Sequence, residues 1–218
     1  MRARLDAPQG GTLMNMEDNR TSTARWTWLR PGRHPGWLWP VAVLLGFPIG
    51  GFIADLVVDG VDSVGTALAA GLIAGAIIGA AEWFALRNWV SWLWIPATTA
   101  GMAVGLAAGA ALVDYGIDRG DVVLMGAVTG LGVGVAQALV LARDRISGAY
   151  WWAIAIPPAW ALGWLVTSYV ITTNVKEQFA VFGGSGALVF GLLTWLLLAF
   201  LLGRPAPDSR RALDAPVR

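Results

Sequence analysis

Six apolar runs make up most of the chain, and each is long enough to cross a membrane as a helix. They cover approximately residues 37–58, 65–86, 91–113, 121–142, 148–171 and 180–202. A helix needs about 20 apolar residues to cross the hydrocarbon core of a bilayer. The runs are continuous rather than alternating, which argues against the strands of a β-barrel. The sequence therefore predicts an all-α, polytopic transmembrane helical bundle with six spans.

The charged and reactive residues are too few for most soluble functions. Only 13% of the 218 residues are charged, and the mean hydropathy is +0.62, whereas about a quarter of a soluble domain is charged. The chain has no cysteine, which excludes disulfides, thiolate metal sites and cysteine nucleophiles. Its single histidine, His34, precedes the first span. Because the spans lack the commonest metal ligand and proton carrier, we expect no metal site and no cofactor.

The charges between the runs alternate in sign along the chain. Arg87 follows the second run, and Arg143 and Arg145 follow the fourth. Both tails are rich in arginine, with six before the first run and four after the last. Since cytoplasmic loops collect arginine and lysine, this pattern predicts both termini in the cytoplasm of a bacterial inner-membrane protein. The connections after odd-numbered runs are acidic or neutral, and with their flanks they hold Asp55, Asp59, Asp62, Asp114, Asp118, Arg119, Asp121, Lys176 and Glu177.

Tryptophan gathers at the predicted cytoplasmic ends of the spans. Indole rings favour the headgroup region of a bilayer, so we interpret these residues as interfacial anchors. Trp160 and Trp164 lie deeper, within the fifth span. The residues at the cytoplasmic ends are Trp37, Trp39, Trp83, Trp89, Trp92, Trp94, Trp151, Trp152 and Trp195.

The sequence repeats itself with a period of about two spans. The stretch WLWPVAVLLGFPIG at 37–50 returns as WLWIPATTAGMAVG at 92–105, a shift of 55 residues. A weaker third copy follows at shifts of 57 and 58. The pattern predicts three tandem two-helix units, approximately 37–86, 91–142 and 148–202, around an axis along the membrane normal. The alternative is that glycine-rich apolar helices resemble one another through composition alone.

Glycine recurs at every fourth position in three of the spans. In lipid, such stripes of small residues let helix backbones approach closely, and they supply much of the packing energy. We therefore expect spans two, four and six at the centre of the bundle, with the tryptophan-bearing spans outside. The packing glycines are Gly71, Gly75 and Gly79 in the second span and Gly126, Gly130 and Gly134 in the fourth, and the third span has Gly101, Gly105 and Gly109.

Glu82 is the one carboxylate in the apolar stretch that leads to the cytoplasmic end of its span. An ionisable residue inside a span is costly and indicates function. Its repeat partners are Gln137 and Thr194, so the three residues are predicted to form a polar ring around a transport pathway, as a constriction or a proton or cation site. Alternatively, Glu82 extends to the nearby interface or forms hydrogen bonds across helices.

Carboxylates also gather on the opposite side of the membrane. Asp55, Asp59, Asp114 and Asp118 form a candidate acidic rim, where carboxylates could concentrate cations at a pore mouth. The alternative is ordinary solvated loop charge.

The sequence GGSG at 183–186 invites comparison with rhomboid intramembrane proteases. Those enzymes need a histidine in another span to activate the serine, and this chain has none in any span. Ser185 also lies in the last span rather than a middle one. We therefore reject this reading and expect no enzymatic activity.

The two tails are predicted to be cytoplasmic, over residues 1–36 and 203–218. The segment RWTWLRPGRHPGW, residues 25–37, mixes arginine with tryptophan, which is typical of an anchor on anionic lipid. Residues before about 24 have the composition of a disordered segment.

The segment GAIIGAAEWFALR, from Gly75 to Arg87, resembles the hairpin repeats of uncharacterised bacterial multi-span membrane proteins. The second copy, GLGVGVAQALVLAR, lacks the tryptophan and shifts the arginine. The resemblance implies membrane residence and tandem hairpins, and it implies no activity.

Two functional hypotheses follow for the whole chain. One is a small-solute or cation transporter or channel, with its pathway on the bundle axis. The other is a non-transport scaffold or subunit of a larger membrane complex. Expected partners are the lipid bilayer and a second copy or complex partner, without nucleic acid.

Overall fold

The computed structural model describes residues 36–170 and 179–202 of the chain. The two tails, including the predicted lipid-binding segment, lie outside the described residues except at Gly36 and Trp37. Within them are six helices, and all six are long and apolar enough to cross a membrane. This confirms the predicted polytopic bundle. The helices are α1 (Leu38–Val58), α2 (Val64–Leu86), α3 (Trp94–Leu112), α4 (Arg119–Arg143), α5 (Ala149–Val170) and α6 (Gly184–Leu202).

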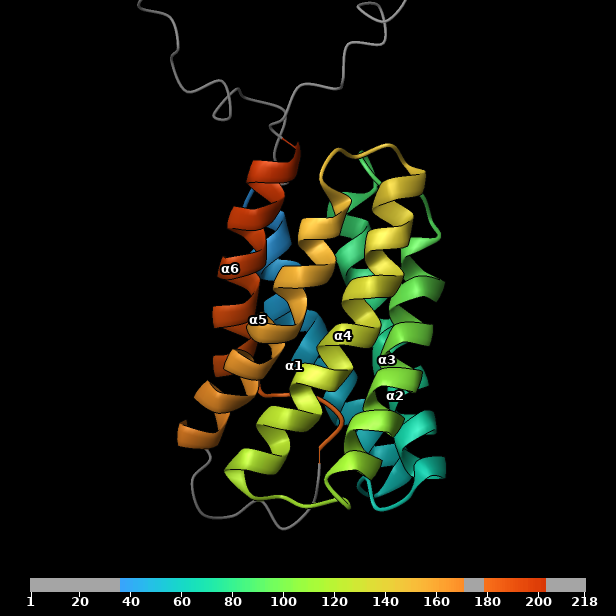
Figure 1. Ribbon diagram of the computed structural model, residues 1–218, viewed down its shortest axis with the longest axis vertical. Helices are drawn as coiled ribbons and strands as arrows, with labels where there is room; N and C mark the ends of the chain where they lie inside the picture. The colour runs from blue at the N-terminus through green and yellow to red at the C-terminus, as the bar shows by residue number, and fades with distance from the viewer. Residues whose placement is uncertain (1–35, 171–178, 203–218) are drawn as a thin grey trace, which may run out of the picture.

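The helices form a closed ring in the order of the sequence. Each helix packs on the next one along the chain, and α6 packs on α1. Successive helices run in opposite directions (Figure 1). The starts of α1, α3 and α5 therefore share one end of the bundle with Arg87, Arg143 and Arg145, which we call the basic end. The acidic end is opposite and carries the aspartates from Asp55 to Asp121.

The expectation that α2, α4 and α6 occupy the centre is wrong. These three helices do not pack extensively on one another. The physical reason is that the glycines lie on the side of each helix that faces its neighbour in the ring. A Cβ on any of Gly71, Gly75 and Gly79 would come within 3.0 Å of an α3 atom. The glycine stripe of α4, made of Gly126, Gly130 and Gly134, lies equally close to α5. The stripes therefore bring neighbours in the ring together and leave the centre to larger side chains.

The centre of the ring is filled by layers of bulky residues. Trp39, Trp94 and Trp152, which we call the Trp triad, come from α1, α3 and α5 and are fully buried. Their ring centroids lie 5.9–6.4 Å apart, with edge-to-face geometry. The interpretation of these three residues as lipid anchors is therefore wrong. It fits the exposed Trp37 and Trp92, whose side chains are 68% and 65% exposed.

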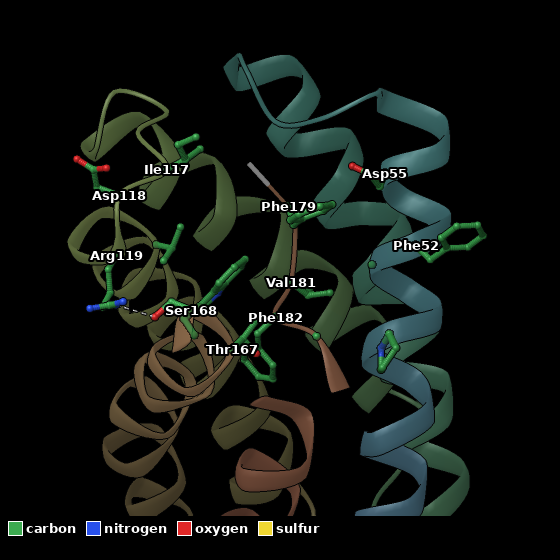
Figure 2. A pocket seen from close by; sticks show the side chains of 15 residues that line it. Phe52, Asp55, Ile117, Asp118, Arg119, Thr167, Ser168, Phe179, Val181 and Phe182 are labelled. Atoms are coloured by element: carbon green, nitrogen blue, oxygen red, sulfur yellow. Dashed lines mark hydrogen bonds between the residues drawn. The ribbon is translucent and has the colours of Figure 1, made fainter. Parts of the chain in front are cut away.

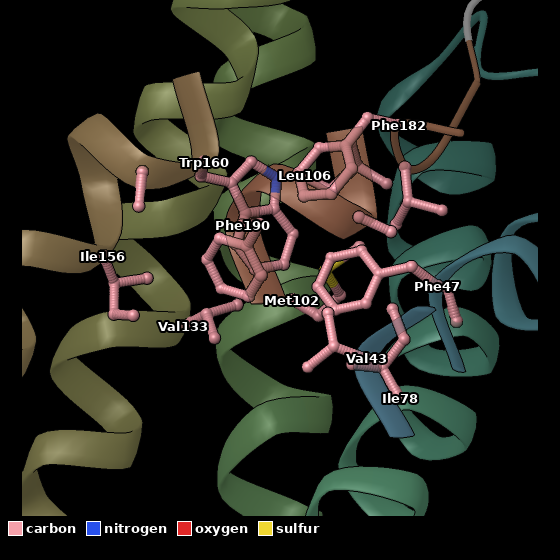
Figure 3. Close-up of a cluster of buried hydrophobic side chains, with 14 of the residues drawn as sticks. Val43, Phe47, Ile78, Met102, Leu106, Val133, Ile156, Trp160, Phe182 and Phe190 are labelled. Atoms are coloured by element: carbon pink, nitrogen blue, oxygen red, sulfur yellow. The ribbon is translucent and has the colours of Figure 1, made fainter. Parts of the chain in front are cut away.

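A second layer follows about two helical turns deeper, eight residues further along each of these helices. Phe47, Met102 and Trp160 are fully buried there and come from the same three helices. They are joined by Phe182 and Phe190 in an aromatic cluster (Figure 3). Phe47, Met102 and Trp160 stand 55 and 58 residues apart, as do the members of the Trp triad. Side chains at corresponding positions of the predicted repeat thus lie at matching levels of the core.

Candidate functional site

The predicted polar ring lies beside the Trp triad. Glu82 Oε2 accepts hydrogen bonds from Trp94 Nε1 at 2.9 Å and from Gln137 Nε2 at 2.8 Å. Gln137 also donates to Thr98 Oγ1, and its Oε1 accepts from Trp152 Nε1, each at 2.8 Å. The structure thus joins helices α2, α3, α4 and α5 through one buried network. Glu82 thus forms hydrogen bonds across helices, as the alternative to a transport role predicts.

Thr194, the third residue of the predicted polar ring, contacts the remaining tryptophan of the triad. Its Oγ1 accepts from Trp39 Nε1 at 2.9 Å and donates to the carbonyl oxygen of Phe190 at 2.7 Å. Each tryptophan of the triad therefore donates to one residue of the polar ring. The exposed fractions of Glu82, Gln137 and Thr194 are 2%, 1% and 2%, so the ring is sealed from solvent. This geometry favours a structural role for the ring, because each of its three residues already accepts a hydrogen bond from a tryptophan of the triad.

A cavity of about 500 Å³ opens at the acidic end of the bundle (Figure 2). Its walls come from α1, the start of α4, the end of α5 and the segment 179–183. The residues that line it are Pro48, Gly51, Phe52, Asp55, Ile117, Asp118, Arg119, Val122, Trp164, Thr167, Ser168, Phe179, Val181, Phe182 and Gly183.

The cavity lies at the end of the bundle where α6 begins late. Gly184 lies 57 residues after Ala127, whereas α4 begins at Arg119, eight residues before Ala127. Compared with α4, α6 therefore lacks about two turns, or about 12 Å of helix, at the acidic end. Residues 179–183 run there without helical structure. The cavity lies beside this segment, between α1 and α5.

Phe182 fixes this segment to the core. Its side chain is fully buried and stacks on Phe47 with ring centroids 4.9 Å apart. A Cβ added to Gly163 would come within 2.8 Å of the Phe182 ring, so a glycine on α5 makes room for it. The neighbouring Gly186 N–H donates to Thr167 Oγ1 at 3.1 Å, which ties the start of α6 to α5. The floor of the cavity is thus a packed aromatic layer.

Two opposite charges stand on facing walls of the cavity. Asp55 of α1 turns its carboxylate toward the segment that carries Phe179 (Figure 2). Its Oδ1 atom is buried and has no hydrogen-bond partner. Arg119 of α4 donates from Nε to Ser168 Oγ at 3.2 Å, and its guanidinium lies 4.0 Å from the ring centroid of Tyr169. The guanidinium therefore contacts α5, whereas the Asp55 carboxylate lines the cavity and makes no hydrogen bond at Oδ1.

The predicted acidic rim is divided by the structure. Asp55 and Asp118 line the cavity. Asp59 and Asp114 follow the ends of α1 and α3, where both adopt left-handed backbone conformations with φ of 56° and 48°. In residues 36–170 and 179–202, no three histidine, cysteine or acidic side chains gather closely enough to hold a metal ion.

The sequence prediction missed most residues of the cavity, including Thr167, Ser168, Phe179 and Phe182. The one available signal was the pair Gly183–Gly184, since glycine in an apolar run is compatible with a late helix start. Comparison with known protein families, characterised proteins and solved structures finds no match to this chain.

Proposed function

We propose that this protein is a small-solute transporter of the bacterial inner membrane and that the cavity at its acidic end is the solute site. The cavity carries the proposal, because a hollow of this volume with a few convergent polar groups is typical of small-molecule sites. The arginines at the basic end and in the tails support cytoplasmic termini, since cytoplasmic segments collect such residues. The solute then enters from the periplasmic side.

We further infer that the bundle consists of three pseudo-symmetric hairpins. The matching partners of the Trp triad support this inference, since each tryptophan bonds the residue at the same repeat position of a neighbouring helix. Many transporters are built from repeated helical units, with their sites where the repeats meet. Here the cavity lies where the third hairpin departs from the other two.

The distribution of space favours a carrier over an open channel. The cavity is accessible at the acidic end, whereas the aromatic layer and the Trp triad fill the interior toward the basic end. A carrier has its site open to one side at a time, and this packing fits a state open to the outside. We therefore place the solute site in the cavity rather than at the polar ring.

Solute uptake by the full chain in liposomes tests this proposal. The probes are radiolabelled rubidium, tetraethylammonium, mannitol and benzenesulfonate, which differ in charge. We expect saturable uptake of at least one probe. Ile117→Trp, which adds bulk at the cavity wall, should reduce it severalfold. Leu131→Trp is the matched control, because Leu131 is an exposed α4 residue outside the cavity lining. Uptake of no probe, or uptake indifferent to Ile117→Trp, would contradict the proposal.

A non-transport membrane subunit is the second candidate. It is favoured by the filled interior, since glycines of α3 contact the backbone of α4 and leave no space between these helices. Purification of the full chain in mild detergent tests it. A stoichiometric membrane partner, together with absent uptake, would support this second function.

A further inference from the structure

We infer that the solute of the cavity is a hydrophobic organic cation, in which an ammonium group is attached to an apolar body. The inference rests on the proposed function, because it assumes that the cavity takes up a solute. It names Asp55 as the group that binds the charge and the aromatic side chains around it as the walls for the apolar body.

Asp55 is the polar group best placed to select a ligand. A buried polar atom without a partner is unfavourable, and Oδ1 of Asp55 is such an atom. Because Asp55 lines the cavity, a ligand that donates a hydrogen bond to its carboxylate or carries a positive charge beside it would compensate this cost. The cation on the facing wall, Arg119, is already bonded to Ser168 and lies over Tyr169. The cavity lining therefore holds two carboxylates, Asp55 and Asp118, and one guanidinium that already contacts Ser168 and Tyr169.

The walls suit an apolar body attached to that charge. Phe179 and Phe182 lie on the segment that faces Asp55 (Figure 2), and Trp164 lines the cavity as well. Aromatic faces attract ammonium groups, and the attraction grows where water is excluded. A bare metal ion is a poor alternative, because the described residues hold no group of three acidic or histidine side chains. Divalent ions such as calcium need six or more oxygen ligands.

The surroundings of the cavity favour cations over anions. Four further aspartates, three of them exposed, lie at the same end of the bundle, and among the described residues Arg119 is the only basic side chain there. Such a one-signed field raises the local concentration of cations and speeds their entry. The aspartates outside the cavity lining are Asp59, Asp62, Asp114 and Asp121.

Binding of three probes with the same benzyl body tests the inference. They are benzyltrimethylammonium, benzyl alcohol and benzylsulfonate, and calorimetry with the full chain in detergent measures their affinities. We expect the cation to bind most tightly. Asp55→Asn should weaken binding of the cation by about tenfold or more, the range expected for loss of a charged partner. The affinity for benzyl alcohol should not change. Asp59→Asn is the matched control, because Asp59 lies one turn away and outside the cavity lining.

Two further variants keep the result interpretable. Asp55→Glu retains the carboxylate and should retain the preference for the cation, even if Asp55→Asn fails to fold. Ile117→Trp should weaken binding of all three probes. Equal affinity for the three probes, all reduced by Ile117→Trp, would overturn the cation inference and leave the solute site standing. Absence of binding by every probe would overturn both.

Discussion

At the scale of single residues, glycine decides how closely the helices approach. A Cβ on Gly105 of α3 would lie 2.8 Å from the carbonyl oxygen of Thr129 and 2.9 Å from its Cα. These atoms belong to the backbone of α4 and cannot rotate away. Gly120, in the first turn of α4, has no atom within 4 Å of the corresponding position. The two glycines therefore differ in what a methyl group would do.

We expect Gly105→Ala to destabilise the protein by about 1–3 kcal/mol, because added bulk in a tight contact forces the helices apart. Gly120→Ala should be neutral or stabilising by up to about 1 kcal/mol, since alanine favours helix more than glycine. Thermal unfolding in detergent measures both. Equal melting temperatures for the two variants would show that the α3–α4 contact is looser than the structure indicates.

The Trp triad shows what sequence reasoning can and cannot place. Trp37 and Trp39 both lie near a span end, so hydropathy treats them alike. Trp37 and Trp92 lie just before the first residues of α1 and α3 and are exposed, whereas Trp39 lies in the first turn of α1 and is buried. Trp92 and Trp94 repeat this pattern, and Trp94 is buried. The three buried tryptophans lie at one level, but only the packing of neighbouring helices determines which tryptophan of each pair faces the core.

Glu82 provides a test of the polar network. Glu82→Leu removes the acceptor of Trp94 Nε1 and one acceptor of Gln137 Nε2. Each buried donor left unpaired costs about 1–3 kcal/mol, so we expect a large loss of thermal stability. Glu82→Gln keeps a carbonyl oxygen as acceptor and should lose much less. If Glu82→Leu were as stable as the wild type, the hydrogen bonds would contribute little, and a role of Glu82 in transport would regain weight.

At the scale of elements, the late start of α6 is the feature that hydropathy missed. The sequence predicts the last span from residue 180, and the structure begins α6 at Gly184. Ala180, Val181 and Phe182 are apolar and buried, so a hydropathy profile cannot separate them from a helix. Their burial comes from contacts with α1 and α5, which are distant in sequence. The cavity itself was therefore beyond prediction from local pattern.

Substitution of the two phenylalanines in this segment should have different effects, one on protein stability and the other on ligand binding. Phe182→Ala removes a fully buried ring and should destabilise the protein by about 3–5 kcal/mol. Phe179 is only half-buried, so Phe179→Ala should change stability little and weaken binding of benzyltrimethylammonium. Thermal unfolding and calorimetry measure the two effects. The reverse pattern would mean that Phe179, rather than Phe182, anchors the segment.

At the scale of the whole molecule, six spans and two charged ends could be predicted because lipid imposes both. An apolar run of sufficient length has few alternatives to a spanning helix. The helix order around the ring could not be predicted in the same way. Every helix is apolar on all sides, so hydropathy does not distinguish the face toward lipid from the face toward the centre. The glycine stripes indicated close helix contacts, but they did not identify the helix against which each stripe packs.

Cysteine labelling checks the proposed orientation, and the absence of natural cysteine makes the background clean. Gly65→Cys and Gly120→Cys place a thiol at exposed positions of the acidic end. Asn88→Cys places one in the exposed α2–α3 connection at the basic end. In intact cells, a membrane-impermeant maleimide should label the first two and spare the third until the membrane is opened. Labelling of Asn88→Cys alone would reverse the orientation.

The closed ring also sets an order for assembly. Apart from the α1–α6 contact, each extensive packing contact joins helices that follow one another in the sequence. Local contacts of this kind form early, so hairpins can associate while the chain is still being synthesised. The seam between α1 and α6 must wait for the last helix. Trp39 therefore remains without its eventual acceptor, Thr194, until the 155 residues that separate them have been synthesised.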